Sequence, residues 1–189
     1  VILNPKSLVV DKDYNGLITE KDTAQYSQRL GTMQTRHLLH EAQRAYNTGI
    51  NDLLLSALAK TLCYSSNIDQ VVIGLEGHGR EEIADKIDTS RTVGWFTSIY
   101  PVRLEVNTHL GGADDLIKSV KEQLRQVPNK GIGYGILKYI NKEESLQGAE
   151  PWEIVFNYLG QADNVVKESN WFSEAEEPAG QIRSDEIVV

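Results

Sequence analysis

Several features that would place a protein in a particular class are scarce in this chain of 189 residues. It has one cysteine, Cys63, which excludes an internal disulfide framework and predicts a reducing, cytoplasmic setting. Basic residues are outnumbered, because 19 lysines and arginines stand against 27 aspartates and glutamates. The formal charge of −8 therefore argues against a nucleic-acid partner. No apolar run approaches the roughly 20 residues that cross a bilayer, so no membrane segment is expected.

The start of the chain lacks a targeting signal. Residues 1–5 carry no basic region followed by an apolar core, so we expect no signal peptide. The first residue is not methionine, and we expect the chain to be a piece of something longer. Its length fits one domain or a large subdomain, and 40% apolar residues suffice for a packed core.

What is present is an alternation of helical and strand-like patterns without an internal repeat. Helices are predicted from Thr35 to Gly49, from Asn51 to Leu62, from Asp114 to Val127 and within 131–140. Strands are predicted at 26–33, 71–76, 93–106 and 152–160. We expect residues 1–24 to be an entry segment or linker, 25–165 the core and 166–189 an irregular tail. The alternation predicts an α/β or α+β fold in two layers, with a mixed β-sheet and flanking helices.

Some details of these elements are also predicted. Thr35 is a fair N-cap for the first helix, and Asn51 or Asp52 for the second. The second helix is expected to pack through Leu54, Leu55, Leu58 and Leu62. The nearly continuous apolar character of 93–106 predicts a strand that is buried on both faces.

The most unusual local chemistry lies at the end of the strand predicted at 71–76. Glu76 shares a strand face with Gly74, whose missing side chain leaves room for a ligand. A carboxylate there is costly unless it is paired or used, because burial raises its pKa toward the range useful for proton transfer. Arg80 follows four residues later and could balance the charge. Taken alone, the pattern favours a structural Glu76–Arg80 ion pair over an acid–base site.

Other candidates have simpler structural explanations. His37, His40 and Glu41 match no zinc-helix signature and predict a polar helix face, so no metal site is expected. The glycines of 131–135 lack the spacing of a nucleotide-binding loop and predict a turn or helix entry. No serine lies in a nucleophile elbow. Cys63 is expected to be a buried, inert thiol.

The aromatic and amide residues near the later strands leave alternatives open. Trp95, Phe96 and Tyr100 are most simply core residues, although alternate faces of their strand could also line a channel. Asn157 and Tyr158 place two hydrogen-bonding side chains on an otherwise apolar strand. A pair at the edge or end of a sheet and a functional pair are equally compatible with that pattern.

Five blocks together carry a resemblance to a known family. They are Asn-Asp-Leu-Leu-Leu from 51, Glu-Gly-His-Gly-Arg-Glu at 76–81, Arg-Thr-Val-Gly-Trp-Phe-Thr-Ser-Ile-Tyr-Pro at 91–101, Pro-Asn-Lys-Gly-Ile-Gly-Tyr-Gly at 128–135 and Phe-Asn-Tyr-Leu-Gly-Gln at 156–161. In this order they resemble the C-terminal half of an epimerization domain of nonribosomal peptide synthetases. These domains are relatives of condensation domains, with a chloramphenicol-acetyltransferase-like fold.

One departure from that family is equally informative. The family's histidine motif, two adjacent histidines followed by an Asp-Gly pair, lies in its N-terminal half, and this chain contains neither pair. We therefore expect that the first lobe is not part of this chain. As an isolated half, the chain is expected to be inactive and to self-associate through the surface that would face the first lobe.

The resemblance implies a reaction and its residues. The reaction is inversion at the α-carbon of an aminoacyl or peptidyl thioester held on the phosphopantetheine arm of a peptidyl carrier protein. No directly bound cofactor or metal is implied. By resemblance, Glu76 is the acid or base, with a histidine of the missing N-terminal lobe as the second group. Arg80 would balance Glu76, and Asn157 and Tyr158 would contact the thioester or shape the pocket. The substrate-binding residues would be His78, Trp95 and Thr97.

Two other functions remain open. The chain could be the lobe of a condensation-type acyltransferase that forms peptide bonds, although such a reaction has no evident need for Glu76. It could also be a non-catalytic lobe that only docks carrier proteins. Such a lobe would tolerate Glu76→Gln and Asn157→Ala without loss.

Overall fold

A computed structural model describes the chain over residues 6–14, 16, 18–19, 22–81, 88–89, 91–106 and 111–160. The chain divides into two compact units. One unit comprises residues 1–9 and 32–158 and contains every helix and strand named below. The other unit comprises residues 10–31 and 159–189. The tail expected at 166–189 lies outside the described residues.

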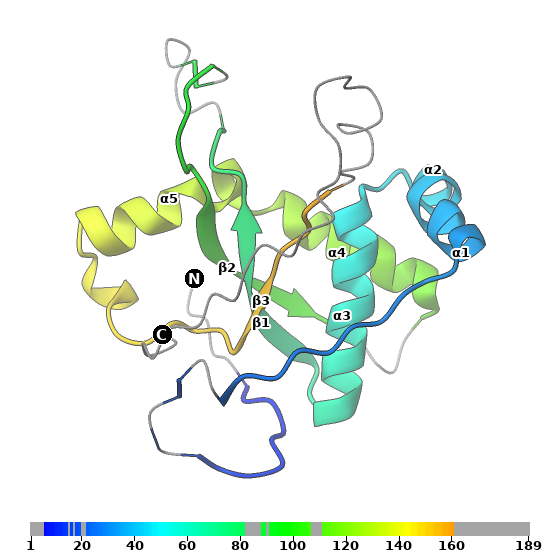
Figure 1. Cartoon of the computed structure of the whole chain (residues 1–189), viewed down its shortest axis with the longest axis horizontal. Coiled ribbons are helices and arrows are strands. Elements are labelled where there is room, and N and C mark those ends of the chain that lie inside the picture. The colour runs from blue at the N-terminus through cyan, green and yellow to red at the C-terminus, as the bar shows by residue number, and fades with distance from the viewer. Residues whose placement is uncertain are drawn as a thin grey trace, which may run out of the picture. The chain divides into compact units, whose positions relative to one another are not determined.

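The sheet of the first unit has a central strand with one antiparallel and one parallel neighbour (Figure 1). The central strand is β1 (Gln70–Gly77). It pairs antiparallel with β2 (Ser98–Glu105) and parallel with β3 (Ile154–Phe156). The prediction of a mixed sheet with flanking helices is therefore confirmed.

The helices of this unit differ in length and regularity. The long ones are α3 (Ile50–Ser66) and α4 (Ala113–Arg125). Before α3, the chain runs through α1 (Thr32–Arg36), the π-helical stretch η2 (His37–Ala42) and α2 (Gln43–Tyr46). After α4 come the 3₁₀ turn η3 (Pro128–Gly131), α5 (Ile132–Gly135), the π-helical η4 (Ile136–Ile140) and the 3₁₀ turn η5 (Glu144–Leu146).

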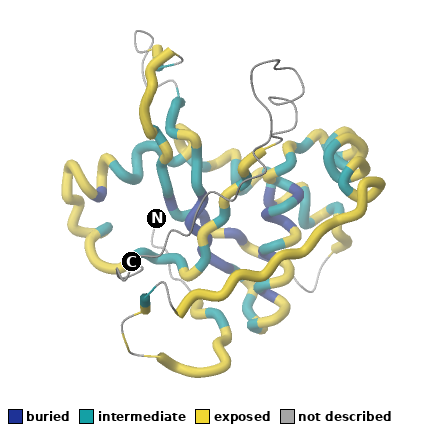
Figure 2. The backbone as a smooth tube through the Cα atoms, in the orientation of Figure 1, coloured by how far each residue is buried: buried dark blue, intermediate teal, exposed yellow. Residues whose placement is uncertain are grey.

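The core lies between one face of the sheet and the helices α3 and α4, where the buried residues gather in Figure 2. Side chains alternate along a strand, so one face of β1 supplies Val71, Ile73 and Leu75 to this core. Their partners from β2, α3 and α4 are Tyr100, Val102, Leu104, Leu55, Ala59, Cys63 and Val120. The opposite face of β1 carries Val72, Gly74 and Glu76.

Strand β2 is buried on one face only. Val102 and Leu104 are buried, whereas Arg103 and Glu105 between them are exposed. The prediction of a strand buried on both faces is wrong, because the charged residues Arg103 and Glu105 alternate with Val102 and Leu104 and lie on the other face. Residues 91–97 precede β2 without regular structure.

The helix boundaries differ from the predicted ones for local reasons. The first helical segment begins at Thr32, so Thr35 is not its N-cap, and Asn47 ends it in a left-handed conformation at φ 49°. Gly49 instead caps α3, with its backbone N–H donating to Oδ2 of Asp52 at 2.8 Å. Asp52 therefore acts from within the first turn of the helix.

The packing face of α3 is rotated from the predicted one. Leu55 is buried, and Leu58 and Leu62 are partly buried against the core. Leu54 is only half-buried, whereas Ala59 and Cys63 are fully buried.

Two strand predictions need correction. Residues 26–31 form no strand, and Met33 belongs to α1. Tyr26 and Leu30 are exposed, because this segment does not alternate and has no apolar face to bury. The strand predicted at 152–160 is only three residues long, and Trp152 precedes it.

Candidate functional site

Glu76 and Asn157 lie at the same end of the sheet, where the parallel strands β1 and β3 both finish. The last paired residues of β1 and β3 are Leu75 and Phe156, so Glu76 and Asn157 come one step later on two parallel neighbours. Their side chains belong to the face opposite the core. Glu76 is half-buried and Asn157 is exposed. The carboxylate of Glu76 has no hydrogen bond or ion pair with any described residue. Tyr158, half-buried, follows Asn157 directly.

The space above Gly74 is already filled. A Cβ at this position would lie 2.8 Å from Nε1 and Cε2 of Trp152. The missing side chain of Gly74 therefore accommodates the indole of Trp152, and our expectation that it leaves room for a ligand is wrong. Sequence reasoning missed Trp152, because nothing in its local pattern indicates which strand it covers.

Arg80 does not pair with Glu76 in this structure. Its guanidinium donates to the backbone carbonyl of Thr89 at 2.5 Å and to that of Gly94 at 3.3 Å. The guanidinium carbon also lies 4.2 Å from the centre of the Phe96 ring. The predicted Glu76–Arg80 pair is corrected, because Arg80 instead holds the segment that leads into β2.

His78, Glu81 and Lys130 form a charged cluster beside the end of β1. The backbone N–H of Arg80 donates to Nδ1 of His78, so the ring proton of neutral His78 lies on Nε2. Nε2 is 3.1 Å from Oε1 of Glu81, and Oε2 of Glu81 is 2.9 Å from Nζ of Lys130. The cluster ties the loop after β1 to η3. Sequence reasoning missed Glu81 and Lys130 as partners, because they are far apart in the chain.

The remaining predicted residues lie on the segment before β2. Trp95 is 89% exposed and Thr97 is also exposed. Phe96 is half-buried beneath Arg80, so the core prediction fails for Trp95 and Phe96. It is correct for Tyr100, which is buried in the core. Burial, and next the charge of Glu81, raise the pKa of Tyr100.

A second cluster of ionisable groups joins η4 to the segment before β3. Lys138 is only 6% exposed, and its Nζ lies 2.7 Å from Oε1 of Glu150. The hydroxyls of Tyr134 and Tyr139 donate to Glu150 at 2.7 and 2.8 Å. Burial raises the pKa of Glu150, but the hydrogen bonds from Lys138 and the tyrosines outweigh it and leave the pKa lowered.

The histidine and cysteine candidates lie where the sequence placed them. His37 and Glu41 are exposed on η2, 3.6 Å apart. Cys63 is buried in α3, and burial raises the pKa of its thiol, as expected of an inert cysteine. Within the described ranges, no group of three or more potential ligands could hold a metal ion. No helix among the described residues has the length and apolarity needed to span a membrane.

The sequence matches a known family over most of its length. Residues 12–186 match the family described as "Condensation domain". Bacitracin synthase 3 of Bacillus licheniformis is 47% identical over 161 residues, which are 84% of this chain and 2% of that protein. Gramicidin S synthase 1 of Brevibacillus brevis is 46% identical over 84% of this chain and 15% of its own length. The chain therefore spans a small part of these relatives.

Solved structures show the same similarity. The crystal structure of the epimerization domain from the third module of tyrocidine synthetase B matches at 38% identity and a TM-score of 0.81. The match covers 97% of this chain and 41% of that chain. A condensation domain of the monacolin K polyketide synthase matches at 19% identity and a TM-score of 0.56, which supports the fold alone.

Proposed function

This chain belongs to the condensation domain family, and on that basis we propose that it is the C-terminal lobe of an epimerization domain in a nonribosomal peptide synthetase. The proposed reaction inverts the α-carbon of an L-aminoacyl or peptidyl residue held as a thioester. The thioester would be delivered on the phosphopantetheine arm of a peptidyl carrier protein. An N-terminal lobe of the same domain would supply the other half of the site.

One observation carries this proposal. Glu76 lies near the end of the central strand β1, on the same face of the sheet as Asn157. Its carboxylate is half-buried and has no partner among the described residues. A structural carboxylate in such a position would normally be paired, because an unpaired charge loses hydration without compensation. A carboxylate that accepts and returns a proton must instead be available to its substrate.

The chemistry follows from the acidity of a proton next to a thioester. The carboxylate of Glu76 takes the Cα proton, and the electron pair of the broken C–H bond moves into the thioester carbonyl to give an enolate. The carboxamide of Asn157 donates a hydrogen bond to the enolate oxygen. An acid from the opposite lobe, a histidine by resemblance, returns a proton to the other face of Cα. The product is the D-aminoacyl thioester.

The other predicted residues take supporting roles in this proposal. Arg80 holds Thr89 and the segment 91–97 in place, as its contacts with Thr89 and Gly94 indicate. His78 fixes the loop after β1 and borders the substrate. Trp95 and Thr97 contact the substrate or its arm from their exposed positions, and Tyr158 shapes the pocket beside Asn157.

The test uses the complete protein that carries this chain, in deuterated water, with a carrier loaded with an L-aminoacyl thioester. We expect deuterium uptake at Cα together with release of D-amino acid, and loss of both or one-directional exchange in Glu76→Gln. Glu122→Gln, an exposed carboxylate of α4, is the matched control and should exchange like the unmodified protein. Absence of uptake in the unmodified protein would refute the epimerase proposal.

A second candidate function comes from the family itself, whose description is that of a condensation domain. A condensation-type lobe would form a peptide bond when an acceptor aminoacyl carrier is added, without prior exchange at Cα. A lobe that only docks carrier proteins would do neither. The same assay with acceptor present separates these outcomes, because only condensation gives a dipeptidyl product without deuterium.

A further inference from the structure

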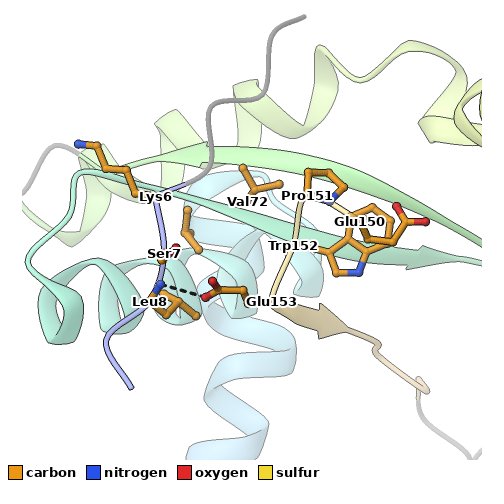
Figure 3. A pocket seen from close by; sticks show the side chains of 9 residues that line it. Lys6, Ser7, Leu8, Val72, Glu150, Pro151, Trp152 and Glu153 are labelled. Atoms are coloured by element: carbon orange, nitrogen blue, oxygen red, sulfur yellow. Dashed lines mark hydrogen bonds between the residues drawn. The ribbon is translucent and has the colours of Figure 1, made fainter. Parts of the chain in front are cut away.

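A small cavity lies beside the amino-terminal half of β1 (Figure 3). Its volume is about 120 Å³. Residues from three parts of the chain line it, among them Lys6, Leu8, Val72, Pro151, Trp152 and Glu153. The backbone N–H of Leu8 donates to Oε2 of Glu153 at 2.9 Å, which joins the entering segment to the approach to β3.

The cavity, the indole of Trp152 and Glu76 occur in order along one face of β1. Val72 borders the cavity, Gly74 lies beneath the indole, and Glu76 follows. These three residues share a face, and each is about 7 Å from the next, given the rise of a strand. The indole therefore stands between the cavity and the carboxylate.

The indole can occupy this place because residue 74 is glycine. The backbone φ of Gly74 is not positive, so its conformation does not require glycine. A Cβ would instead lie 2.8 Å from Nε1 and 2.9 Å from Cδ1 of Trp152. The glycine thus serves the close approach of the aromatic ring to the strand.

The cluster of Lys138, Tyr134, Tyr139 and Glu150 lies next to the indole. The ring centres of Tyr134 and Trp152 are 6.0 Å apart, with the planes inclined by 58°. The hydroxyl of Tyr134 donates to Glu150, two residues before Trp152, and Lys138 pairs with the same carboxylate. Glu150 thus links Tyr134 to the segment that carries Trp152, and the indole packs between the Tyr134 ring and Gly74.

We propose that Trp152 is the residue that limits the size of the substrate side chain, by closing the Val72 cavity off from the site of Glu76. This inference rests on the proposed epimerase function. Removal of the indole would join the cavity to the site. The space left by the indole, added to the cavity of about 120 Å³, would be large enough for an aromatic side chain, with Val72 and Pro151 as apolar contacts and Lys6 and Glu153 at the polar side of the cavity.

The test measures deuterium exchange at Cα for carriers loaded with L-alanine and with L-phenylalanine, using the complete protein. We expect Trp152→Ala to raise the phenylalanine-to-alanine rate ratio by about tenfold or more, a usual effect of pocket size. Trp152→Phe keeps a ring against Tyr134 and should give an intermediate ratio. Tyr64→Ala, which truncates an exposed aromatic residue of α3, should leave the ratio unchanged.

The outcomes distinguish the two proposals. An unchanged ratio in Trp152→Ala and Trp152→Phe, with exchange on alanine retained, would overturn the role of Trp152 and leave the epimerase function standing. If Trp152→Ala does not fold by circular dichroism, the ratio in Trp152→Phe decides in the same way. Absence of exchange in the unmodified protein would refute the epimerase function, and the role of Trp152 with it.

Discussion

Gly79 lies so close to Phe96 that a side-chain carbon at residue 79 would overlap the carbonyl oxygen of Phe96. Gly79 also has a φ of +65°, which disfavours residues with a Cβ. Both requirements arise where the loop after β1 crosses the segment before β2. This crossing positions the loop after β1, which carries His78 and Glu81, relative to the end of the sheet.

Gly79→Ala is expected to destabilise the protein. A left-handed conformation costs a residue with a Cβ about 1–3 kcal/mol, and the overlap with Phe96 adds to this cost. Urea denaturation followed by circular dichroism measures the change. Gly133→Ala is the matched control, because Gly133 lies in α5 with open space around its missing Cβ. That variant should be neutral or slightly more stable, and equal stabilities of the two variants would contradict the prediction.

Arg80→Lys is expected to loosen Thr89 and residues 91–97, which precede β2. Lysine cannot reproduce two guanidinium hydrogen bonds to the carbonyls of Thr89 and Gly94 while stacking on Phe96. Limited proteolysis should then cut this segment faster than in the unmodified protein. Arg103→Lys, which changes an exposed arginine of β2 paired with Glu105, should leave the cleavage rate unchanged. Unaltered cleavage in Arg80→Lys would show that other contacts hold the segment.

Glu150→Gln is expected to be more destabilising than the double variant Lys138→Met with Glu150→Gln. The single change leaves the buried ammonium of Lys138 without its counter-charge. Breaking a fully buried pair lowers the free energy of unfolding by about 3 kcal/mol or more. We expect a smaller decrease here, because Glu150 is partly solvated. The double change removes both charges. Thermal denaturation and urea titration of the two variants and the unmodified protein measure this order.

The exposed pair of Lys118 and Asp114 on α4 provides the comparison. Lys118→Met should cost no more than about 0.5 kcal/mol, because water solvates both partners. A similar cost for Lys118→Met and Glu150→Gln would mean that the buried cluster does not anchor the segment before Trp152.

The free energy of unfolding should fall at acid pH, because protonation of Glu150 removes its contribution. Its pKa is lowered from the ordinary 4.5, so its contribution is present above that value and is lost as the pH falls through the folded-state pKa. Urea midpoints between about pH 3 and pH 6 measure the slope. Glu150→Gln should flatten it, and an unchanged slope would assign the acid sensitivity to other carboxylates.

The free energy of unfolding should also fall at alkaline pH, because the phenol of Tyr134 then loses its proton. Burial, and next the hydrogen bond to Glu150, raise the pKa of this phenol from its ordinary value of 10.0. The unfolded phenol therefore loses its proton first, and stability falls as the pH rises above that value. Tyr134→Phe should decline less steeply than the unmodified protein in the same titration. Identical slopes would contradict the assignment.

Much of the fold could be read from local pattern. The strand predicted at 71–76 is β1, and Glu76 and Gly74 share a face of it as predicted, because a strand sends alternate side chains to opposite sides. The helix predicted from Asp114 to Val127 is α4, in which Leu116, Val120 and Leu124 recur every four residues and lie in or against the core. The motif blocks also predicted the family, since their order in the chain does not depend on how it folds.

Contacts between segments that are distant in the sequence could not be predicted from local pattern. Arg80 follows Glu76 closely, yet its guanidinium contacts carbonyls near Thr89 and Gly94, because the loop turns it toward Phe96. The contact between Gly74 and Trp152 depends on the parallel pairing of β1 with β3, which joins segments about 80 residues apart in the sequence.

The sequence by itself thus determined which side chains share a strand face, which segments form helices and which family the chain resembles, because these properties depend on neighbours along the chain. Only the tertiary structure decided that Glu76 stands without a partner among the described residues while Trp152 fills the space above Gly74. The reason is physical: pairing of charges and filling of space depend on the distances between segments, and strand register and loop direction fix those distances.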